Sequence, residues 1–128
     1  MRIALIGDIH GNLPALEAVM GDLDSRADTD AIYHLGDLGG SAPWPNAVGS
    51  LLRERGSQGI AGNYDSTVAT RHDHCGCAYE DPVQVELANL SYSWTLEHTS
   101  QETVRWLAAL PFRLEVRPLG GHMAGPTL

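Results

Sequence analysis

The 128-residue chain is long enough to fold as one domain, 1–128, and its 43% of hydrophobic residues is ordinary for a soluble globular protein. The formal charge of −8, with arginine as the only basic residue type, argues against a nucleic-acid or anionic-membrane partner. Without an apolar run of about 18 residues, a secretion signal or distant cysteines, the sequence excludes transmembrane and disulfide-scaffold classes and favours the cytoplasm.

Two strand–helix units and a third strand are predicted in the first half of the chain. Short β-type runs and apolar residues at helical spacing give strand 2–6, helix 13–23, strand 31–35, helix 45–55 and strand 58–61. Asn12 is placed to cap the first helix, and Pro14 is tolerated in its first turn. Strands that alternate with helices pair in parallel through right-handed crossovers, so we expect an α/β fold that begins βαβαβ.

A loop and a long helix are predicted next. Residues 66–80 are polar and show no period, which predicts a loop over or beside the functional site. Asp81 before Pro82 indicates the start of a helix, because this pair suits the cap and the first helical position. The apolar stripe of this helix consists of Val83, Leu87, Leu90 and Trp94.

A second helix and a strand are predicted near the end of the chain. Thr99 and Glu102 have capping-box spacing, which predicts a helix that begins there and ends before Pro111. Residues 112–117 alternate apolar and charged side chains, as a half-buried antiparallel strand does. Residues 118–128 contain glycine and proline and predict a loop.

Ligand-type side chains follow each of the three predicted parallel strands. Asp8 and His10 lie two residues apart after the first strand, so both side chains can converge on one cation. Asp37 and Asn63 each follow a glycine at the end of the second and third strands. Gly-Asp and Gly-Asn pairs also occur as plain turns. Because ligand sites in open α/β sheets form at the carboxyl ends of the strands, the three coincidences favour a metal site.

Three motifs, in this order and spacing, resemble those of the calcineurin-like metallophosphoesterase family, in particular its phosphodiesterase-like branch. They are Asp8-x-His10-Gly11-Asn12, Gly36-Asp37-x-x-Gly40 and Gly62-Asn63-x-Asp65. The resemblance implies the amino-terminal part of a four-layer αββα sandwich with a dinuclear metal centre. It also implies the hydrolysis of phosphomonoesters, phosphodiesters or nucleotides. We expect the carboxyl-terminal half of that fold to be absent from this chain.

The resemblance implies a role for each matching residue. Asp8 and His10 would bind the first metal ion, Asp37 would bridge both ions, and Asn63 would bind the second ion. One carboxylate can serve two cations about 3.5–4 Å apart, and such ions lower the pKa of a bridging water so that it attacks the phosphate. Mixed oxygen and nitrogen ligands suit Mn, Fe or Zn better than Mg. Catalysis would then involve Asp37, Asn63 and the neighbouring Tyr64.

Tyr64 departs from the family pattern, which usually has a histidine that acts on the leaving-group oxygen at this position. A phenol titrates near a pH of about 10, so Tyr64 would donate a hydrogen bond but transfer a proton poorly at neutral pH. This favours esters whose leaving groups need little protonation. The alternative interpretation is that Tyr64 is an aromatic residue that packs over the site.

The later histidine motifs of the family, His-Gly and Gly-His-x-His, do not occur in this chain. The first metal position therefore keeps Asp8, His10 and Asp37, whereas the second keeps only Asp37 and Asn63. We expect a metal ion to bind at the first position, and weakly. The missing half would also leave part of the sheet uncovered, which favours self-association.

A dense cluster of ligand-type residues lies within the predicted loop. It consists of His72, His74, Cys75 and Cys77. A structural zinc site is one interpretation, but adjacent ligands strain a tetrahedron, and a substrate-facing or solvated loop is favoured. His34, within the second strand, is expected to be a hydrogen-bonded residue of the core or of a sheet face, and His122 is expected in a loop.

Two functions follow from these patterns. The first is metal-dependent hydrolysis of phosphate esters, with a nucleotide or another small phosphate ester as substrate. The alternative is a catalytically inactive metal-binding or interaction module, which Tyr64 and the absent histidines favour. A nucleotide-binding domain without metal is disfavoured, because the turns lack GxGxxG and GxxxxGK[ST] patterns.

Overall fold

The structure is a computed structural model, and it describes residues 1–117. The predicted loop 118–128, with His122, lies outside the described residues. The elements, in chain order, are β1 (Ile3–Ile6), α1 (Leu13–Arg26), β2 (Ala31–His34), α2 (Pro45–Glu54), β3 (Gln58–Gly59), α3 (Asn63–Thr70), α4 (Pro82–His98) and α5 (Gln101–Ala108). Among these elements, no helix combines the length and the apolar character that crossing a membrane requires.

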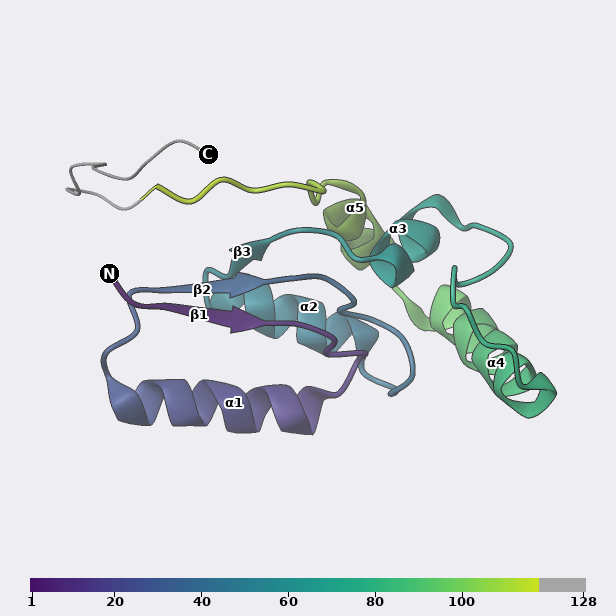
Figure 1. Cartoon of the computed structure of the whole chain (residues 1–128), viewed down its shortest axis with the longest axis horizontal. Helices are drawn as coiled ribbons and strands as arrows, with labels where there is room; N and C mark the ends of the chain where they lie inside the picture. The colour runs from purple at the N-terminus through teal and green to yellow at the C-terminus, as the bar shows by residue number, and fades with distance from the viewer. Residues whose placement is uncertain (118–128) are drawn as a thin grey trace.

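A parallel three-stranded sheet in the order β1-β2-β3 forms the centre of the fold (Figure 1). Leu5 pairs with Tyr33, and His34 pairs with Gly59. α1 connects β1 to β2 and α2 connects β2 to β3, and the two helices contact each other along one face of the sheet. The predicted βαβαβ start is confirmed, although β3 is shorter than expected.

The hydrophobic core lies between the sheet and these two crossover helices and continues among the helices that follow β3. Asn12 caps α1 as predicted, because its side-chain oxygen accepts from the Ala15 N–H at 3.1 Å. Ala4 and Ile6 of β1 are half-buried on the helix side, whereas Leu5 on the opposite face is exposed. Buried residues of the core include Leu16, Met20, Leu38, Val48 and Leu52.

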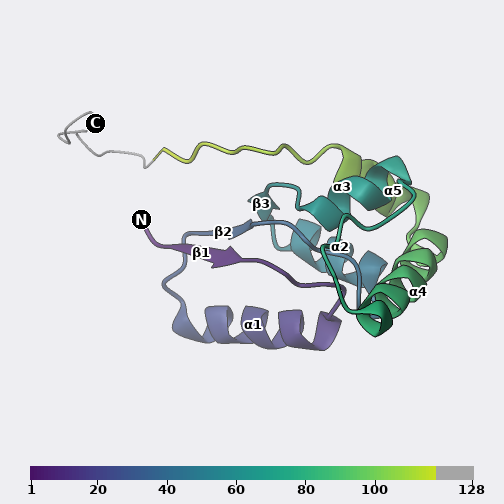
Figure 2. The same ribbon diagram turned by 45° about the vertical axis from the view of Figure 1, so that its right-hand side comes forward.

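α3, α4 and α5 gather beyond the carboxyl ends of the strands (Figure 2). α3 packs on α5, and the Tyr92 hydroxyl of α4 lies 2.9 Å from the Thr67 carbonyl oxygen and 2.8 Å from that of His72. The loop predicted over 66–80 is therefore too long at its start, since residues 63–70 are helical. Serine and threonine hydroxyls of α3 bond to carbonyl oxygens of the same turn, which makes a polar segment compatible with a helix.

Three expectations for the second half differ from the structure. The apolar stripe of α4 faces solvent, with Leu90 68% exposed, because α4 packs through Tyr92 and Thr95 instead. α5 is capped by Ser100, whose hydroxyl accepts from the Thr103 N–H at 3.2 Å, one residue after the predicted cap. Residues 112–117 form no strand, and within residues 1–117 they have no ladder partner.

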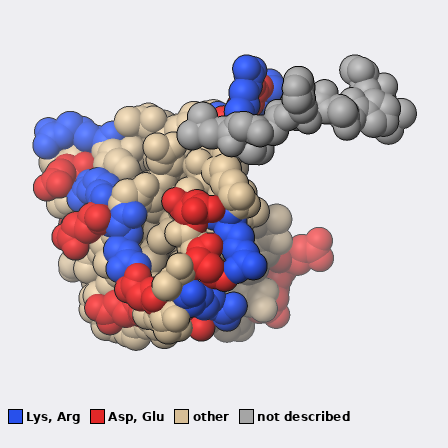
Figure 3. Space-filling view, turned by 90° about the vertical axis from the view of Figure 1, so that its left-hand side faces the viewer, with Lys and Arg blue, Asp and Glu red and all other residues tan. Residues whose placement is uncertain are grey.

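Charged side chains of both signs alternate over the end of the molecule that is farthest from α4 (Figure 3). Arg2 pairs with Asp28, Arg55 pairs with Asp24, and Arg26 pairs with Asp22 at 2.7 Å. Because arginines there are matched by carboxylates, this face presents no continuous basic patch to a polyanion.

Candidate metal centre

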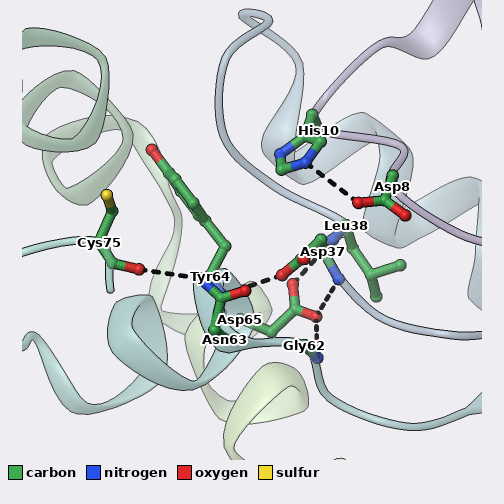
Figure 4. Close-up of polar contacts among 9 residues, drawn as sticks. All are labelled: Asp8, His10, Asp37, Leu38, Gly62, Asn63, Tyr64, Asp65 and Cys75. Carbon is green, nitrogen blue, oxygen red and sulfur yellow. Dashed lines mark hydrogen bonds and ion pairs between the residues drawn. The ribbon is translucent and has the colours of Figure 1, made fainter. Parts of the chain in front are cut away.

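Asp8, His10 and Asp37 converge at the carboxyl edge of the sheet (Figure 4). Each offers one ligand atom, and these atoms all lie within 4.8 Å of one another. Asp8 and His10 belong to the turn after β1, and Asp37 belongs to the turn after β2. The parallel pairing of the two strands therefore brings three of the four predicted ligands together.

The backbone of this group is held in an uncommon conformation. Asp8, His10 and Asp37 have φ angles of 52°, 47° and 53°, in the left-handed region. A residue other than glycine in such a region costs on the order of 1–3 kcal/mol and persists only where its surroundings hold it. Here the Asp8 N–H donates to the Gly36 carbonyl oxygen at 3.2 Å, and the His10 N–H donates to that of Asp37 at 2.9 Å. Hydrogen bonds between the two turns thus fix the three side chains.

The Asp37 carboxylate is fixed by the third turn of the sheet edge. Its Oδ1 accepts from the Tyr64 N–H at 2.9 Å, at the start of α3. A Cβ on Gly62 would lie 2.2 Å from the same oxygen, so only glycine permits this approach. The glycine before the predicted ligand Asn63 is therefore explained by the position of Asp37.

Asp65 connects the turns after β2 and β3 through hydrogen bonds to their backbone. Its side chain is 0% exposed, and it accepts hydrogen bonds from the N–H groups of Asp37 at 2.7 Å, Leu38 at 2.9 Å and Gly62 at 2.9 Å. A buried carboxylate with three charge-assisted bonds is a strong local constraint. The sequence motif includes Asp65 without assigning it a role, although an acidic residue in the first turn of a helix is a readable signal for bonds to free N–H groups.

Asn63 and Tyr64 lie beside the three converging residues. Asn63 is the first residue of α3, and its Nδ2 donates to the Cys75 carbonyl oxygen at 3.2 Å. Tyr64 is buried, with its ring edge-on to His10 at 5.9 Å and to Tyr92 at 5.6 Å between centroids. The Tyr64 hydroxyl has no hydrogen-bond partner among residues 1–117. The ring packs against His10 and Tyr92, and the hydroxyl is buried.

The donor set fits a divalent cation. Two carboxylates and one imidazole are the ligands that Mn, Fe and Zn accept. The Asp8 side chain is 80% exposed and its Oδ1 lies 3.6 Å from His10 Nε2, so an ion can enter from solvent. The other ring nitrogen of His10 is buried, and it has no hydrogen-bond partner in the described part of the chain.

The loop cluster does not form a second centre. Cys75 and Cys77 are joined in a disulfide, so neither offers a thiolate. His72 and His74 lie edge to face at 4.5 Å between ring centroids. Within residues 1–117, Asp8, His10 and Asp37 are the sole group of three or more such ligands, which leaves the zinc interpretation without support. His34 is buried, as one predicted position requires, but neither of its ring nitrogens has a hydrogen-bond partner within residues 1–117.

Residues 1–119 match the family model of the calcineurin-like phosphoesterases. The chain belongs to this family. It is 31% identical over 113 residues to the uncharacterized protein MJ0912 of Methanocaldococcus jannaschii, an alignment that covers 88% of this chain and 43% of that protein.

Solved structures of this fold include a metallophosphoesterase from Sphaerobacter thermophilus, with 32% identity and a TM-score of 0.68 over 91% of this chain and 44% of that one. A protein proposed to be a diadenosine tetraphosphatase matches with a TM-score of 0.61, covering 86% of this chain and 43% of its own. Its 24% identity supports the fold alone. The phosphoesterase chain described here spans less than half the length of these relatives.

Proposed function

We propose that this chain contributes the amino-terminal half of a metal-dependent phosphate-ester hydrolase site. The observation that carries the proposal is the convergence of the Asp8, His10 and Asp37 ligand atoms within 4.8 Å at the carboxyl edge of the sheet. Family membership supports the same chemistry. The substrate class is a small phosphate ester, either a diester or a monoester and including nucleotides.

Each residue has a defined role in this proposal. Asp8 and His10 hold the first ion, Asp37 holds both ions, and Asn63 holds the second. Bound divalent ions, with Mn the first candidate and Fe or Zn the others, supply positive charge for the phosphoryl group and lower the pKa of water. The Asp37 oxygen that accepts from the Tyr64 N–H is oriented for this task before an ion arrives.

Tyr64 would donate its hydroxyl proton in a hydrogen bond to the leaving-group oxygen. The position of Tyr64 beside the ligand residue His10, at 5.9 Å between ring centroids, supports the assignment. Because a phenol keeps its proton at neutral pH, leaving groups that are stable as anions are preferred.

Hydrolysis of bis(4-nitrophenyl) phosphate with added Mn²⁺ tests the proposal directly. Asp8→Ala removes a ligand that is mostly exposed, so little effect on folding is expected. The variant should lose Mn²⁺ affinity and turnover, and both losses would then come from the site itself. Glu17→Ala, an exposed carboxylate on α1, is the charge-matched control and leaves both unchanged.

The alternative is a catalytically inactive metal-binding module, which is favoured by Tyr64 at the position where a histidine is expected. Binding of Mn²⁺ that Asp8→Ala removes, without turnover of any aryl ester, would assign the chain to this alternative. Failure to bind Mn²⁺, Fe²⁺ or Zn²⁺ would reject both functions.

Two further properties belong to the proposal. We place the protein in the cytoplasm, as the sequence composition favours, although the Cys75–Cys77 disulfide is a bond that a reducing compartment disfavours. We also propose that it self-associates through the sheet face opposite α1 and α2, where Leu5 is 60% and Leu35 is 52% exposed.

A further inference from the structure

A cavity of about 380 Å³ shares a wall with the candidate metal centre. His10 and Tyr64 form that wall, and α4 forms the opposite side with Gln84, Leu87 and Ala88. Tyr79, from the loop before α4, completes the rim. Because His10 belongs to both, the cavity adjoins the metal centre.

The residues that line the cavity suit an uncharged, flat ligand. None of the residues that line the cavity is an arginine, an aspartate or a glutamate, so it offers no cation for additional phosphate groups. Tyr79 presents an exposed aromatic ring, Leu87 an exposed apolar side chain, and Gln84 an amide that can both donate and accept. Aromatic rings, apolar walls and a few polar groups are typical of pockets for organic ligands.

Two unsatisfied polar atoms lie in the shared wall. The Tyr64 hydroxyl and His10 Nδ1 are both buried, and neither has a hydrogen-bond partner within residues 1–117. Tyr64 itself is 5% exposed and faces the cavity. Buried polar groups of native proteins are almost always paired with protein or ordered water, so these two atoms add polar character to a wall that is otherwise aromatic and apolar.

We propose that this cavity binds the planar aromatic group of the phosphate ester, with Tyr79 stacking on the ring and Leu87 covering its edge. This inference rests on the proposed function, because it places the phosphate of the same molecule at Asp8, His10 and Asp37. A nucleobase and a simple aryl group share this planar aromatic chemistry. Only the nucleobase has ring nitrogens and exocyclic groups that the Gln84 amide can pair with.

Three phosphonates that cannot be hydrolysed test the proposal by calorimetric titration with Mn²⁺. Methylphosphonate occupies only the metal centre, benzylphosphonate adds an aryl ring, and the 5′-methylenephosphonate analogue of AMP adds a nucleoside. Both aromatic compounds are expected to bind at least about tenfold more tightly than methylphosphonate, as base stacking on an aromatic side chain allows. Tighter binding of the nucleoside compound, lost in Gln84→Leu, would identify the nucleobase as the source.

Tyr79→Ala and Leu87→Ala should remove most of the aromatic advantage while methylphosphonate binding stays unchanged. Both side chains are exposed, so these variants should fold. Phe112→Ala, which removes an exposed aromatic ring outside this cavity, should keep the full advantage.

Two negative results have different meanings. Equal affinity for all three phosphonates would overturn the cavity proposal and leave the proposed function standing. Binding of Mn²⁺ without binding of any phosphonate would overturn both, because the metal centre would then hold no phosphate-like group.

Discussion

Asp65 is the residue on which the geometry of the candidate site depends most. Both of its carboxylate oxygens already accept hydrogen bonds from backbone N–H groups, so Asp65 holds the turns and does not act as a metal ligand. Through the N–H groups of Asp37 and Gly62 it joins the turns that follow β2 and β3. Asp65 is therefore a positioning residue, and its substitution tests the architecture of the site.

Asp65→Asn should lower the free energy of unfolding by at least about 2 kcal/mol, because an amide nitrogen would face backbone donors that now bond to a charged oxygen. Urea denaturation measures this change. Asp22→Asn, which weakens an exposed pair with Arg26, is the control and should cost at most about 1 kcal/mol. Equal stability of both variants would show that Asp65 does not hold the turns.

Tyr64→Phe separates packing from hydrogen bonding at one atom. The hydroxyl has no partner among residues 1–117, so its removal should leave the melting temperature unchanged or raise it. If the hydroxyl acts on the leaving group, the rate for an alkyl ester should fall about tenfold or more, and the rate for a 4-nitrophenyl ester much less. Equal loss on both ester types would count against that role.

His34 makes stability depend on pH. Burial lowers the pKa of His34, and the nearby charge of Asp65 offsets part of this effect. Between this lowered pKa and about 6.5, the unfolded chain binds a proton that the folded chain does not. The stabilising contribution is therefore complete above about pH 6.5 and is lost as the pH falls through that window, by up to about 1.4 kcal/mol per pH unit.

Urea titrations between about pH 5 and pH 7.5 measure this slope. His34→Leu should reduce it, whereas His98→Gln, a change at an exposed histidine near the end of α4, should not. An unchanged slope in His34→Leu would assign the pH dependence to other groups.

At the scale of elements, α4 combines a well-defined start with an unusual orientation. The Asp81 carboxylate accepts from the Val83 N–H at 2.9 Å and the Gln84 N–H at 3.0 Å, as the cap predicted from the sequence requires. The periodicity of the apolar residues predicted the helix correctly, but it predicted the wrong face of the helix to be buried. An apolar stripe indicates contact with something apolar, and in this structure the contact with α3 runs through Tyr92 instead.

Asp81→Ala should destabilise α4 by about 0.5–2 kcal/mol, because two N–H groups of the first turn lose their acceptor. Hydrogen exchange of the α4 amides reports this loss locally. Asp81→Ser should restore most of the protection, and Glu86→Ala, at an exposed position of the same helix, should have no comparable effect. Uniform loss of protection across α1 and α4 would instead indicate global unfolding.

For the molecule as a whole, local patterns predicted the parallel sheet and the convergence of three site residues well. Gly36 and Gly62 mark sharp turns. The order of the strands follows from the chain topology, and so does the gathering of the site residues at the carboxyl ends of the parallel strands. The strand predicted over residues 112–117 was wrong, because a strand needs a neighbouring strand to pair with, and alternating side chains do not show whether one is present. The metal-binding role of Asn63 stays a prediction, since its side-chain amide donates to Cys75 here.

Self-association should depend on the open face of the sheet. Leu5 and Leu35 lie exposed there, with Phe112 nearby, so the apparent mass by light scattering should rise with protein concentration. Leu5→Lys combined with Leu35→Lys should suppress this rise. Val83→Lys combined with Leu90→Lys, on the open face of α4, is the matched control, and suppression by this pair alone would relocate the interface.

The left-handed backbone of Asp8 and His10 has a consequence for any attempt to engineer this protein. Glycine adopts such φ angles without a steric penalty, so glycine at either position should relax the turn and raise thermal tolerance. The same replacement deletes a donor atom from the cluster. A laboratory selection for heat resistance alone would therefore enrich variants that are more stable and no longer bind a cation.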